Sequence, residues 1–142
     1  MDILFKNATV FRGDGAPVRA DALAAEGRLS LFPVGGAPAG VPVLDGTDIC
    51  VFPGFADVHV HFREPGFSYK ETIRTGTMAA ARGGYTTVCL MPNLDPVPED
   101  LETLERELEI IRRDAVIRAI PYGAITRGQR GQELADLGAM AP

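Results

Sequence analysis

The pattern of hydrophobic and polar positions changes near residue 53 of the chain. Before that point, short apolar runs are separated by turn-forming residues at close intervals. After it, apolar runs of strand length alternate with longer segments whose apolar positions recur at helical spacing. The first pattern is typical of a small β-sandwich or a meander, and the second is typical of parallel strands joined by helical crossovers. We therefore predict a small β-sandwich domain at residues 1–52 and an α/β domain at residues 53–142.

The first half carries strand patterns with turn signals between them. Segment 21–32 is a predicted β-hairpin, because Glu26-Gly27 separates two short apolar runs. Further strand patterns lie at 3–11, 41–44 and 49–52. No cluster of chemically reactive side chains occurs in this half, so we expect the chemistry to lie elsewhere.

The second half begins with a strand pattern and a helical pattern. Strands are predicted at 54–62, 85–91 and 115–120. The first helix is predicted to begin at Ser68, an N-cap with Glu71 three residues later, and to end at Gly83-Gly84. Its predicted buried face consists of Tyr69, Ile73, Thr77, Ala80 and Ala81.

A second helical pattern follows the proline-rich loop 92–98, and a third begins within 131–142. The second has an apolar face of Leu101, Leu104, Leu108 and Ile111, with Glu102–Arg106 and Glu109–Arg113 spaced for ion pairs on the solvent side. Three parallel strands with helices on one face leave the other face uncovered, and a (β/α)8 barrel normally takes about 250 residues. We therefore predict an α/β fold that is the N-terminal part of a larger TIM barrel, ending after two and a half repeats.

The composition narrows the classes of function. The formal net charge is −5, so no basic excess favours binding to nucleic acid or to an anionic membrane. No apolar run approaches the roughly 20 residues that span a bilayer. The N-terminal segment lacks the basic start and cleavage site of a signal peptide, which favours the cytoplasm. Cys50 and Cys89 lie in separate apolar runs, so we expect both to be buried free thiols.

Both histidines of the chain, His59 and His61, lie in the predicted strand 54–62. Residues two apart in a strand share a face, so Asp57 and Arg63 are predicted to lie on the same side as the histidines. Two imidazoles at this spacing can bind one cation, and histidine suits Zn2+. A polar strand face with ordinary hydrogen bonds is the alternative. The start of a barrel pattern, whose C-terminal rim usually carries the active site, favours the metal.

Two further polar side chains are predicted at the same rim. Arg63 offers a planar guanidinium suited to a carboxylate or phosphate. Asn93 follows the next strand, and parallel strands deliver their C-terminal loops to one edge of a sheet. Both side chains can therefore meet one anionic ligand. The alternatives are a surface ion pair for Arg63 and a turn role for Asn93. Lys70 is expected to be solvated.

The motifs together resemble those of a known enzyme family. FPGFADVHVHFREPG at 52–66 and GGYTTVCLMPN at 83–93 look like the signatures of dihydroorotase, a zinc enzyme of the cyclic amidohydrolase group. PYGAITRGQRGQELADLGAM at 121–140 is similar to the third unit of that family, so the resemblance covers essentially the whole chain. MPNLDP departs from the more usual MPNTxP, which affects one loop position.

The resemblance implies reversible hydrolysis of dihydroorotate to N-carbamoyl-L-aspartate in pyrimidine biosynthesis, with zinc polarising the ring amide. His59 and His61 would ligate one of the one or two Zn2+ ions of a full-length subunit, and Asp57 would have a supporting role. Arg63 and Asn93 would hold the carboxylate of the substrate. A homo-oligomer and an association with aspartate transcarbamoylase are possible partners that the resemblance suggests.

Several parts of the family's site do not occur in these residues. No histidine follows residue 61, and no bridging ligand is recognisable, since Asp95 and Asp114 are expected to be cap and connection residues. The aspartate that acts as general base is expected beyond residue 142. A catalytic zinc site needs three protein ligands, so we expect the 142-residue chain alone to be inactive and to bind zinc weakly.

Two alternative functions remain open. The first is a hydantoinase or allantoinase relative with the same metal site. Arg63 and Asn93 favour dihydroorotase, because a neutral ring would not need carboxylate recognition. The second is a non-catalytic, dihydroorotase-like scaffold for aspartate transcarbamoylase, against which the presence of His59 and His61 argues.

Overall fold

The computed structural model describes residues 2–13 and 15–141. The chain folds into two compact units, Met1–Pro53 and Gly54–Pro142. The boundary between them lies where the hydrophobic pattern of the sequence changes. Among the described residues, no helix is long and apolar enough to cross a membrane.

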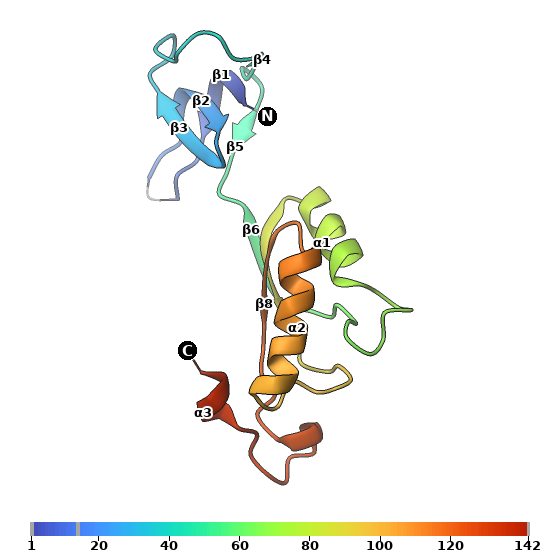
Figure 1. Ribbon diagram of the computed structural model, residues 1–142. Coiled ribbons are helices and arrows are strands. Elements are labelled where there is room, and N and C mark those ends of the chain that lie inside the picture. The colour runs from blue at the N-terminus through green and yellow to red at the C-terminus, as the bar shows by residue number, and fades with distance from the viewer. Residues whose placement is uncertain (1, 14, 142) are drawn as a thin grey trace. The chain divides into compact units, whose positions relative to one another are not determined.

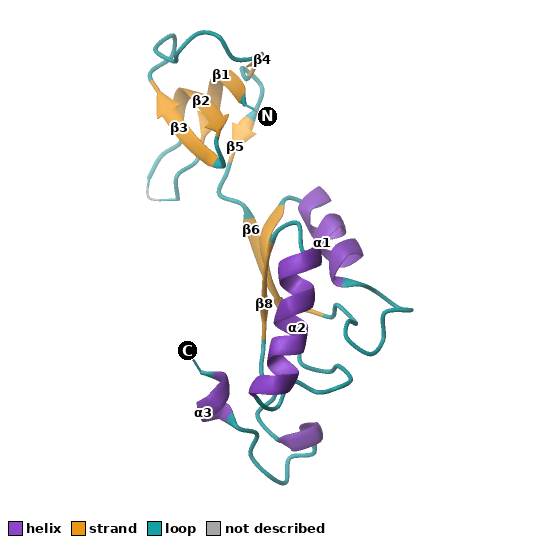
Figure 2. Ribbon diagram, viewed as in Figure 1, coloured by secondary structure: helices purple, strands orange, loops and turns teal. Residues whose placement is uncertain are grey.

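The first unit is one mixed β-sheet (Figures 1 and 2). Its strands are β1 (Ile3–Val10), β2 (Val18–Ala25), β3 (Arg28–Phe32), β4 (Val43–Asp45) and β5 (Cys50–Val51). The sheet order is β3-β2-β1-β4, and β5 also pairs with β1. The β1–β2 and β2–β3 pairs are antiparallel, whereas β4 and β5 run parallel to β1.

The predicted hairpin of the first unit is confirmed, but its predicted sandwich is not formed by these strands. Glu26 and Gly27 join β2 to β3 with positive φ angles of 50° and 72°, as a tight hairpin turn requires. A sandwich needs a second sheet, and the described strands of this unit all belong to one. Strand spacing alone could not distinguish these cases, because it does not say which strands pair.

The second unit is a three-stranded parallel sheet with two crossover helices, so the predicted α/β class is confirmed. The elements are β6 (Phe55–Val60), α1 (Ile73–Arg82), β7 (Tyr85–Leu90), α2 (Leu101–Asp114), β8 (Arg118–Pro121), a 3-10 turn η1 (Arg127–Gln129) and α3 (Leu137–Met140). The strand order is β6-β7-β8. Figure 2 shows α1 and α2 on the same side of this sheet.

The core of the second unit lies between the sheet and these helices. Phe62, Ile73, Val88 and Leu90 are its buried members, and Ile110 and Ile111 of α2 pack against them. Gly76 of α1 leaves room for Phe62: a Cβ at that position would lie 2.4 Å from two atoms of the Phe62 ring. The glycine therefore sets how closely α1 approaches the end of β6.

The N-cap of helix α1 lies four residues later than predicted. Thr72 is the N-cap and forms a capping box with Thr75, whereas Ser68 hydrogen-bonds Glu64 at 3.4 Å. Tyr69 precedes the helix and is 80% exposed, so its prediction as a core residue is wrong. Lys70 is exposed, as predicted. The predicted end at Gly83-Gly84 is confirmed, with Gly83 as C-cap.

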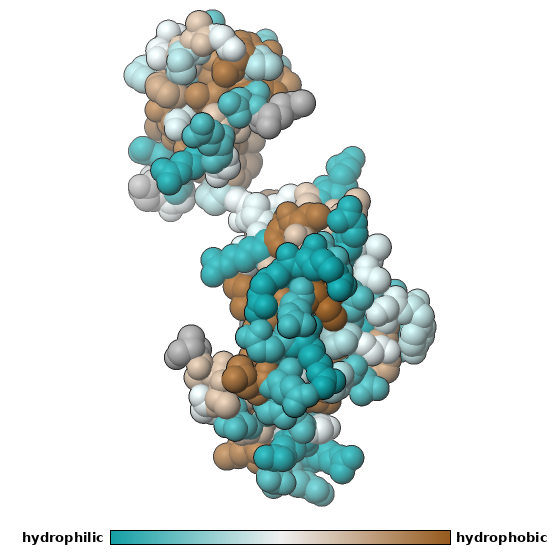
Figure 3. All heavy atoms as spheres, viewed as in Figure 1, coloured by the Kyte–Doolittle hydropathy of each residue, from teal (hydrophilic) through white to brown (hydrophobic). Residues whose placement is uncertain are grey.

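Helix α2 has its predicted two-faced character, and its outer side is largely hydrophilic in Figure 3. The Glu102–Arg106 pair is confirmed, but Arg113 pairs with Asp114 instead of Glu109. Leu101 is exposed, while Glu107, a carboxylate on the apolar side, is buried. Among the described residues, neither Glu107 oxygen has a hydrogen-bond partner, and burial raises the pKa of Glu107 to about 8.

The last segment and the two cysteines differ from the predictions. The third helical pattern forms only the single turn α3, because residues 126 and 134 pair as an isolated β-bridge and hold the preceding residues in a loop. Cys50 is exposed and Cys89 is partly buried; both are free thiols.

Candidate metal centre at the C-terminal edge of the sheet

The two histidines converge where strand β6 ends. His59 lies in β6, and His61 is the first residue after Val60, the last residue of that strand. Their Nε2 atoms are 3.3 Å apart, although both side chains remain exposed. The alternation of β6 at its end places both imidazoles on one side, because only Val60 separates them. The structure therefore brings the predicted pair together.

Strand β6 is irregular between Asp57 and the histidine pair. Asp57 pairs with Val88 of β7, whereas Val60 pairs with Leu90, so three residue steps on β6 oppose two on β7. One extra residue of this kind is a β-bulge, which interrupts the regular alternation of side chains on which the prediction for Asp57 rests. The Asp57 carboxylate accepts a hydrogen bond of 3.0 Å from the backbone N–H of His59 and so lies beside the first histidine.

Asn93 reaches the histidine pair from the next strand. It follows β7 in the loop after Met91, and its side-chain Oδ1 is 2.8 Å from Nδ1 of His61. The loop is fixed on both sides of Asn93: Met91 N–H donates to the Val60 carbonyl, and Asp95 N–H donates to the Pro65 carbonyl. The predicted meeting of the two loops is thus present, but Asn93 contacts a histidine and not Arg63.

Arg63 lies in the loop that leads from β6 to α1. Its side chain is partly buried and makes no ion pair or hydrogen bond with other described residues. The neighbouring Glu64 fixes this loop, because its carboxylate accepts a hydrogen bond of 3.0 Å from Ile73 N–H at the start of α1. Gly66 permits close contact with the other loop: at φ +94°, a Cβ would lie 2.4 Å from the Asp95 carbonyl oxygen.

A cavity of about 560 Å³ adjoins His59. Its walls come from the ends of all three strands, among them Val58, Met91 and Tyr122. The Tyr122 hydroxyl donates a 3.3 Å hydrogen bond to the Val58 carbonyl, which ties the end of β8 to the bulge of β6. A hydrogen bond with the Cys89 side chain, followed by burial, raises the pKa of Tyr122. Sequence reasoning missed Tyr122, although an aromatic residue directly after a predicted parallel strand is a usable signal.

Two histidines are fewer ligands than a closed metal site requires. Among the described residues, no group of three or more His, Cys, Asp or Glu side chains is placed to hold one ion. Imidazole nitrogens suit Zn2+, and the arrangement can supply two of the three protein ligands of an open zinc site. What is present is therefore a pair of converging imidazoles, one of which lines a cavity.

The comparison with known families decides what kind of chain carries this pair. The model of a family described as dihydro-orotase-like matches residues 49–142, which include the histidines, Arg63 and Asn93. The chain belongs to the dihydroorotase-like family.

Curated relatives of this dihydroorotase-like chain are similar over most of its length. A dihydroorotase of Fusobacterium nucleatum subsp. nucleatum is 61% identical over 99 residues, which cover 70% of this chain and 23% of that protein. A dihydroorotase of Lactobacillus leichmannii is 40% identical over 140 residues, covering 99% of this chain and 33% of that protein. The chain thus spans between about a quarter and a third of the length of these relatives.

A solved structure has the same fold. The L-hydantoinase (dihydropyrimidinase) from Arthrobacter aurescens superposes with a TM-score of 0.78 at 22% sequence identity, covering 89% of this chain and 28% of that one. At this identity the likeness concerns the fold alone.

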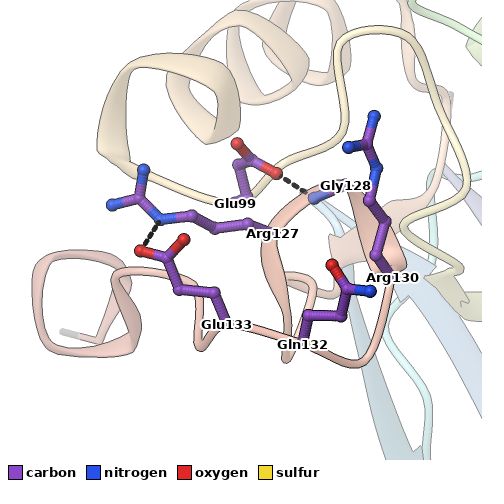
Figure 4. Close-up of a pocket in the computed structure, with 6 residues that line it drawn as sticks. All are labelled: Glu99, Arg127, Gly128, Arg130, Gln132 and Glu133. Carbon is purple, nitrogen blue, oxygen red and sulfur yellow. Dashed lines mark hydrogen bonds and ion pairs between the residues drawn. The ribbon is translucent and has the colours of Figure 1, made fainter.

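The dihydroorotase-like chain also has a second hollow, of about 310 Å³, beyond the end of β8 (Figure 4). Two of its charged side chains form an ion pair, and a third binds a backbone N–H. Arg127 Nε lies 3.3 Å from Glu133 Oε1, and Gly128 N–H donates to the Glu99 carboxylate. These contacts fasten the loop after β8 to the residues that precede α2, so the hollow has a structural role in this fold.

Proposed function

We propose that this chain provides the first part of the active site of a zinc-dependent dihydroorotase, which reversibly hydrolyses dihydroorotate to N-carbamoyl-L-aspartate. Membership of the dihydroorotase-like family supports the reaction class. The observation that carries the metal site is the 3.3 Å separation between Nε2 of His59 and Nε2 of His61. The step belongs to pyrimidine biosynthesis in this proposal.

The histidine pair fits zinc in its spacing as well as in its chemistry. Tetrahedral zinc with Zn–N distances of about 2.0–2.1 Å holds two ligating nitrogens about 3.3–3.4 Å apart. The observed Nε2–Nε2 separation of 3.3 Å is the same. His59 and His61 would therefore hold one zinc ion with little movement of either ring, and a full-length subunit would contain one or two ions.

Further ligands must come from other parts of the protein. A catalytic zinc keeps three protein ligands and one open position, so at least one ligand is needed in addition to the two histidines. In this proposal that ligand, and the aspartate that acts as general base, belong to later strands of a TIM barrel. The second unit leaves several large apolar side chains exposed, among them Val58, Ile125 and Leu134. Packing of further barrel elements against them would bury these side chains, which supports the proposal. We accordingly expect the 142-residue chain alone to be inactive.

Arg63 and Asn93 are the proposed binding residues for the carboxylate of the substrate. The Arg63 guanidinium has no anionic partner among the described residues and lies in the loop directly after the histidine pair. Arginine binds carboxylates through two parallel hydrogen bonds, which fix orientation as well as position. A carboxylate held there would place the ring of dihydroorotate at the mouth of the cavity beside His59.

The reaction itself is the addition of water across the ring amide bond. The oxygen of water joins the carbonyl carbon, the carbon–nitrogen bond breaks, and the ring nitrogen leaves with a proton. Zinc, when bound, polarises the carbonyl and lowers the pKa of water. The residues of this chain bind and orient: the histidines hold the ion, and Arg63 and Asn93 hold the substrate. Asp57 supports His59 through the hydrogen bond to its backbone N–H.

The finer fold and assembly are part of the same proposal. The sheet of the first unit exposes several large apolar side chains, including Leu29, Leu31 and Val43. A second sheet packed on such side chains would complete the β-sandwich domain that precedes the barrel. A homo-oligomer or a complex with aspartate transcarbamoylase is compatible with this arrangement.

The proposal is tested by the substrate range of the intact protein. We expect turnover of dihydroorotate with bound zinc, and little turnover of hydantoin or allantoin. Arg63→Gln should raise the KM for dihydroorotate about 10–100-fold, because a charge-assisted hydrogen bond contributes about 1.5–3 kcal/mol. Arg82→Gln, an exposed position at the end of α1, is the matched control. Preference for hydantoin, an unchanged KM in Arg63→Gln, or full turnover after removal of zinc would contradict the proposal.

A further inference from the structure

His61 and Asn93 form a contact that joins a proposed zinc ligand to a proposed substrate-binding residue. Oδ1 of Asn93 lies 2.8 Å from Nδ1 of His61. We propose that Asn93 is a positioning residue for His61 as well as a substrate-binding residue: its Oδ1 fixes the His61 ring for zinc, while its Nδ2–H groups receive the carboxylate of the substrate. This inference rests on the proposed function and adds a second role to one side chain of that site.

The chemistry of the amide determines which His61 nitrogen carries the proton. A carbonyl oxygen can only accept a hydrogen bond, so Nδ1 of His61 must donate. A neutral imidazole has one N–H, and Nε2 of His61 therefore keeps a free lone pair. That is the atom which lies 3.3 Å from Nε2 of His59. Asn93 thus holds His61 in the tautomer that zinc binding requires.

The two histidines differ in this respect. Nδ1 of His59 has no hydrogen-bond partner among the described residues. The hydrogen bonds of the described residues therefore orient the ring of His61 and leave Nδ1 of His59 without a fixed partner. Asn93 thus positions one of the two proposed ligands.

The loop around Asn93 is built to hold it in place. Leu94, the next residue, is 4% exposed, and its N–H donates to the Pro92 carbonyl at 2.9 Å. Asp95 N–H donates to the Pro65 carbonyl, which links the loop after β7 to the loop that contains Arg63. Hydrogen bonds from outside the metal ligands are the usual means by which proteins orient a ligating histidine. The amide is thus a fixed partner of His61.

The unused hydrogen-bond donors of the Asn93 amide indicate the second role, which is binding of the substrate carboxylate. The Nδ2 group of Asn93 offers two N–H donors and has no acceptor among the described residues. The Arg63 loop begins two residues after His61, so a carboxylate at this edge can meet both a guanidinium and an amide donor. One side chain would then connect the position of the metal ligand with the position of the substrate.

Substitutions at Asn93 separate the two roles. In the intact protein, Asn93→Ala removes both acceptor and donor, and we expect zinc affinity to fall about 10–100-fold and the KM for dihydroorotate to rise. Asn93→Asp keeps an acceptor for His61 but places a negative charge beside the substrate carboxylate. It should retain zinc affinity within about 3-fold, given that the acceptor is preserved, while its KM rises. Gln132→Ala, a surface amide outside the cavity, is the control and should change neither quantity.

A second readout does not depend on activity or on the folding of the Asn93 variants. The His61 signals in the 15N NMR spectrum of the zinc-free protein are assigned by their loss in His61→Gln. We expect them to show that Nδ1 of His61 carries the proton. An Nε2–H tautomer at His61, or an unchanged zinc affinity in a folded Asn93→Ala, would overturn the inference while leaving the proposed function intact. If the wild-type protein neither binds zinc nor turns over dihydroorotate, the proposed function fails, and the NMR result still decides the His61–Asn93 contact.

Discussion

The helical side and the C-terminal edge of the same three-stranded sheet use polar groups in opposite ways. On the helical side, Phe62, Ile73 and Leu90 are buried. The buried carboxylate of α2, Glu107, has no hydrogen-bond partner in the part of the chain that the structure describes. At the edge, His59, His61 and Asn93 contact one another while remaining accessible to solvent. We therefore expect substitutions on the helical side to change the stability of the fold. Substitutions of the exposed polar side chains at the edge should change binding and leave the stability of the fold largely unchanged.

The strongest test of this contrast removes one ligand from the edge. In the intact protein, His59→Ala should lower turnover on the order of 10³-fold or more, because zinc contributes several kcal/mol to stabilising the transition state. The free energy of unfolding, measured with a chelator present, should change by less than about 0.5 kcal/mol, as expected of an exposed side chain. Turnover within tenfold of wild type would contradict the role of the edge.

The reverse test removes a side chain from the helical side. Phe62→Ala should lower the free energy of unfolding by about 3–5 kcal/mol, since it leaves a cavity between β6 and α1. Tyr69→Ala is the matched control: this aromatic residue is 80% exposed and should cost less than about 0.5 kcal/mol. Urea unfolding measures the free energy of unfolding of both variants. Equal losses in the two variants would contradict the claim that the packed side chains, and not the exposed ones, stabilise the fold.

Glu107 should make the free energy of unfolding depend on pH. Its pKa is raised to about 8 from an ordinary value of 4.5, so the unfolded chain releases the proton first as pH rises. Stability from this group is complete below pH 4.5 and is lost progressively up to about pH 8. The loss should amount to about 2 kcal/mol between pH 5 and pH 7.

Substitution isolates this contribution. Glu107→Gln cannot ionise and should abolish this part of the pH dependence, whereas Glu109→Gln on the exposed side of α2 should leave it unchanged. Unfolding in urea across the same pH range measures both variants. A slope in Glu107→Gln equal to that of wild type would show that another group is responsible.

The smallest expected effect concerns the hydrogen bond that links β8 to the bulge of β6. Tyr122→Phe removes the hydroxyl that donates to the Val58 carbonyl at 3.3 Å. A neutral hydrogen bond contributes about 0.5–1.5 kcal/mol, and we expect a loss of stability in that range by thermal unfolding. A loss above about 3 kcal/mol would mean that the hydroxyl contributes more than this one hydrogen bond.

Local signals in the sequence predicted much of this fold. Gly83-Gly84 ends α1 and Glu26-Gly27 turns the hairpin, because these conformations depend on a few adjacent residues. The HxH spacing placed His59 and His61 side by side for the same reason. Features that depend on pairing between strands were not predictable in this way. The β-bulge between Asp57 and Val60 exists only in the register of β6 against β7.

Competition between similar local signals explains the other differences. Ser68 and Thr72 both precede a plausible helix, and Thr72 forms the cap, with Glu64 accepting the N–H of Ile73. That choice leaves Tyr69 outside the helix and exposed. Likewise, Asn93 was predicted at the correct edge, but its contact with His61 depends on how two loops pack. Residue types and spacing predicted which side chains lie at this edge, and tertiary packing determined which of their atoms meet.

The most direct test of the central claim is a zinc-edge anomalous diffraction map of the intact protein crystallised with Zn2+. We predict one peak bound by Nε2 of His59 and Nε2 of His61 at about 2.0–2.1 Å, with Nδ1 of His61 still bonded to Asn93. A peak bound through Nδ1 of His61, or no peak at this edge of the sheet, would contradict it.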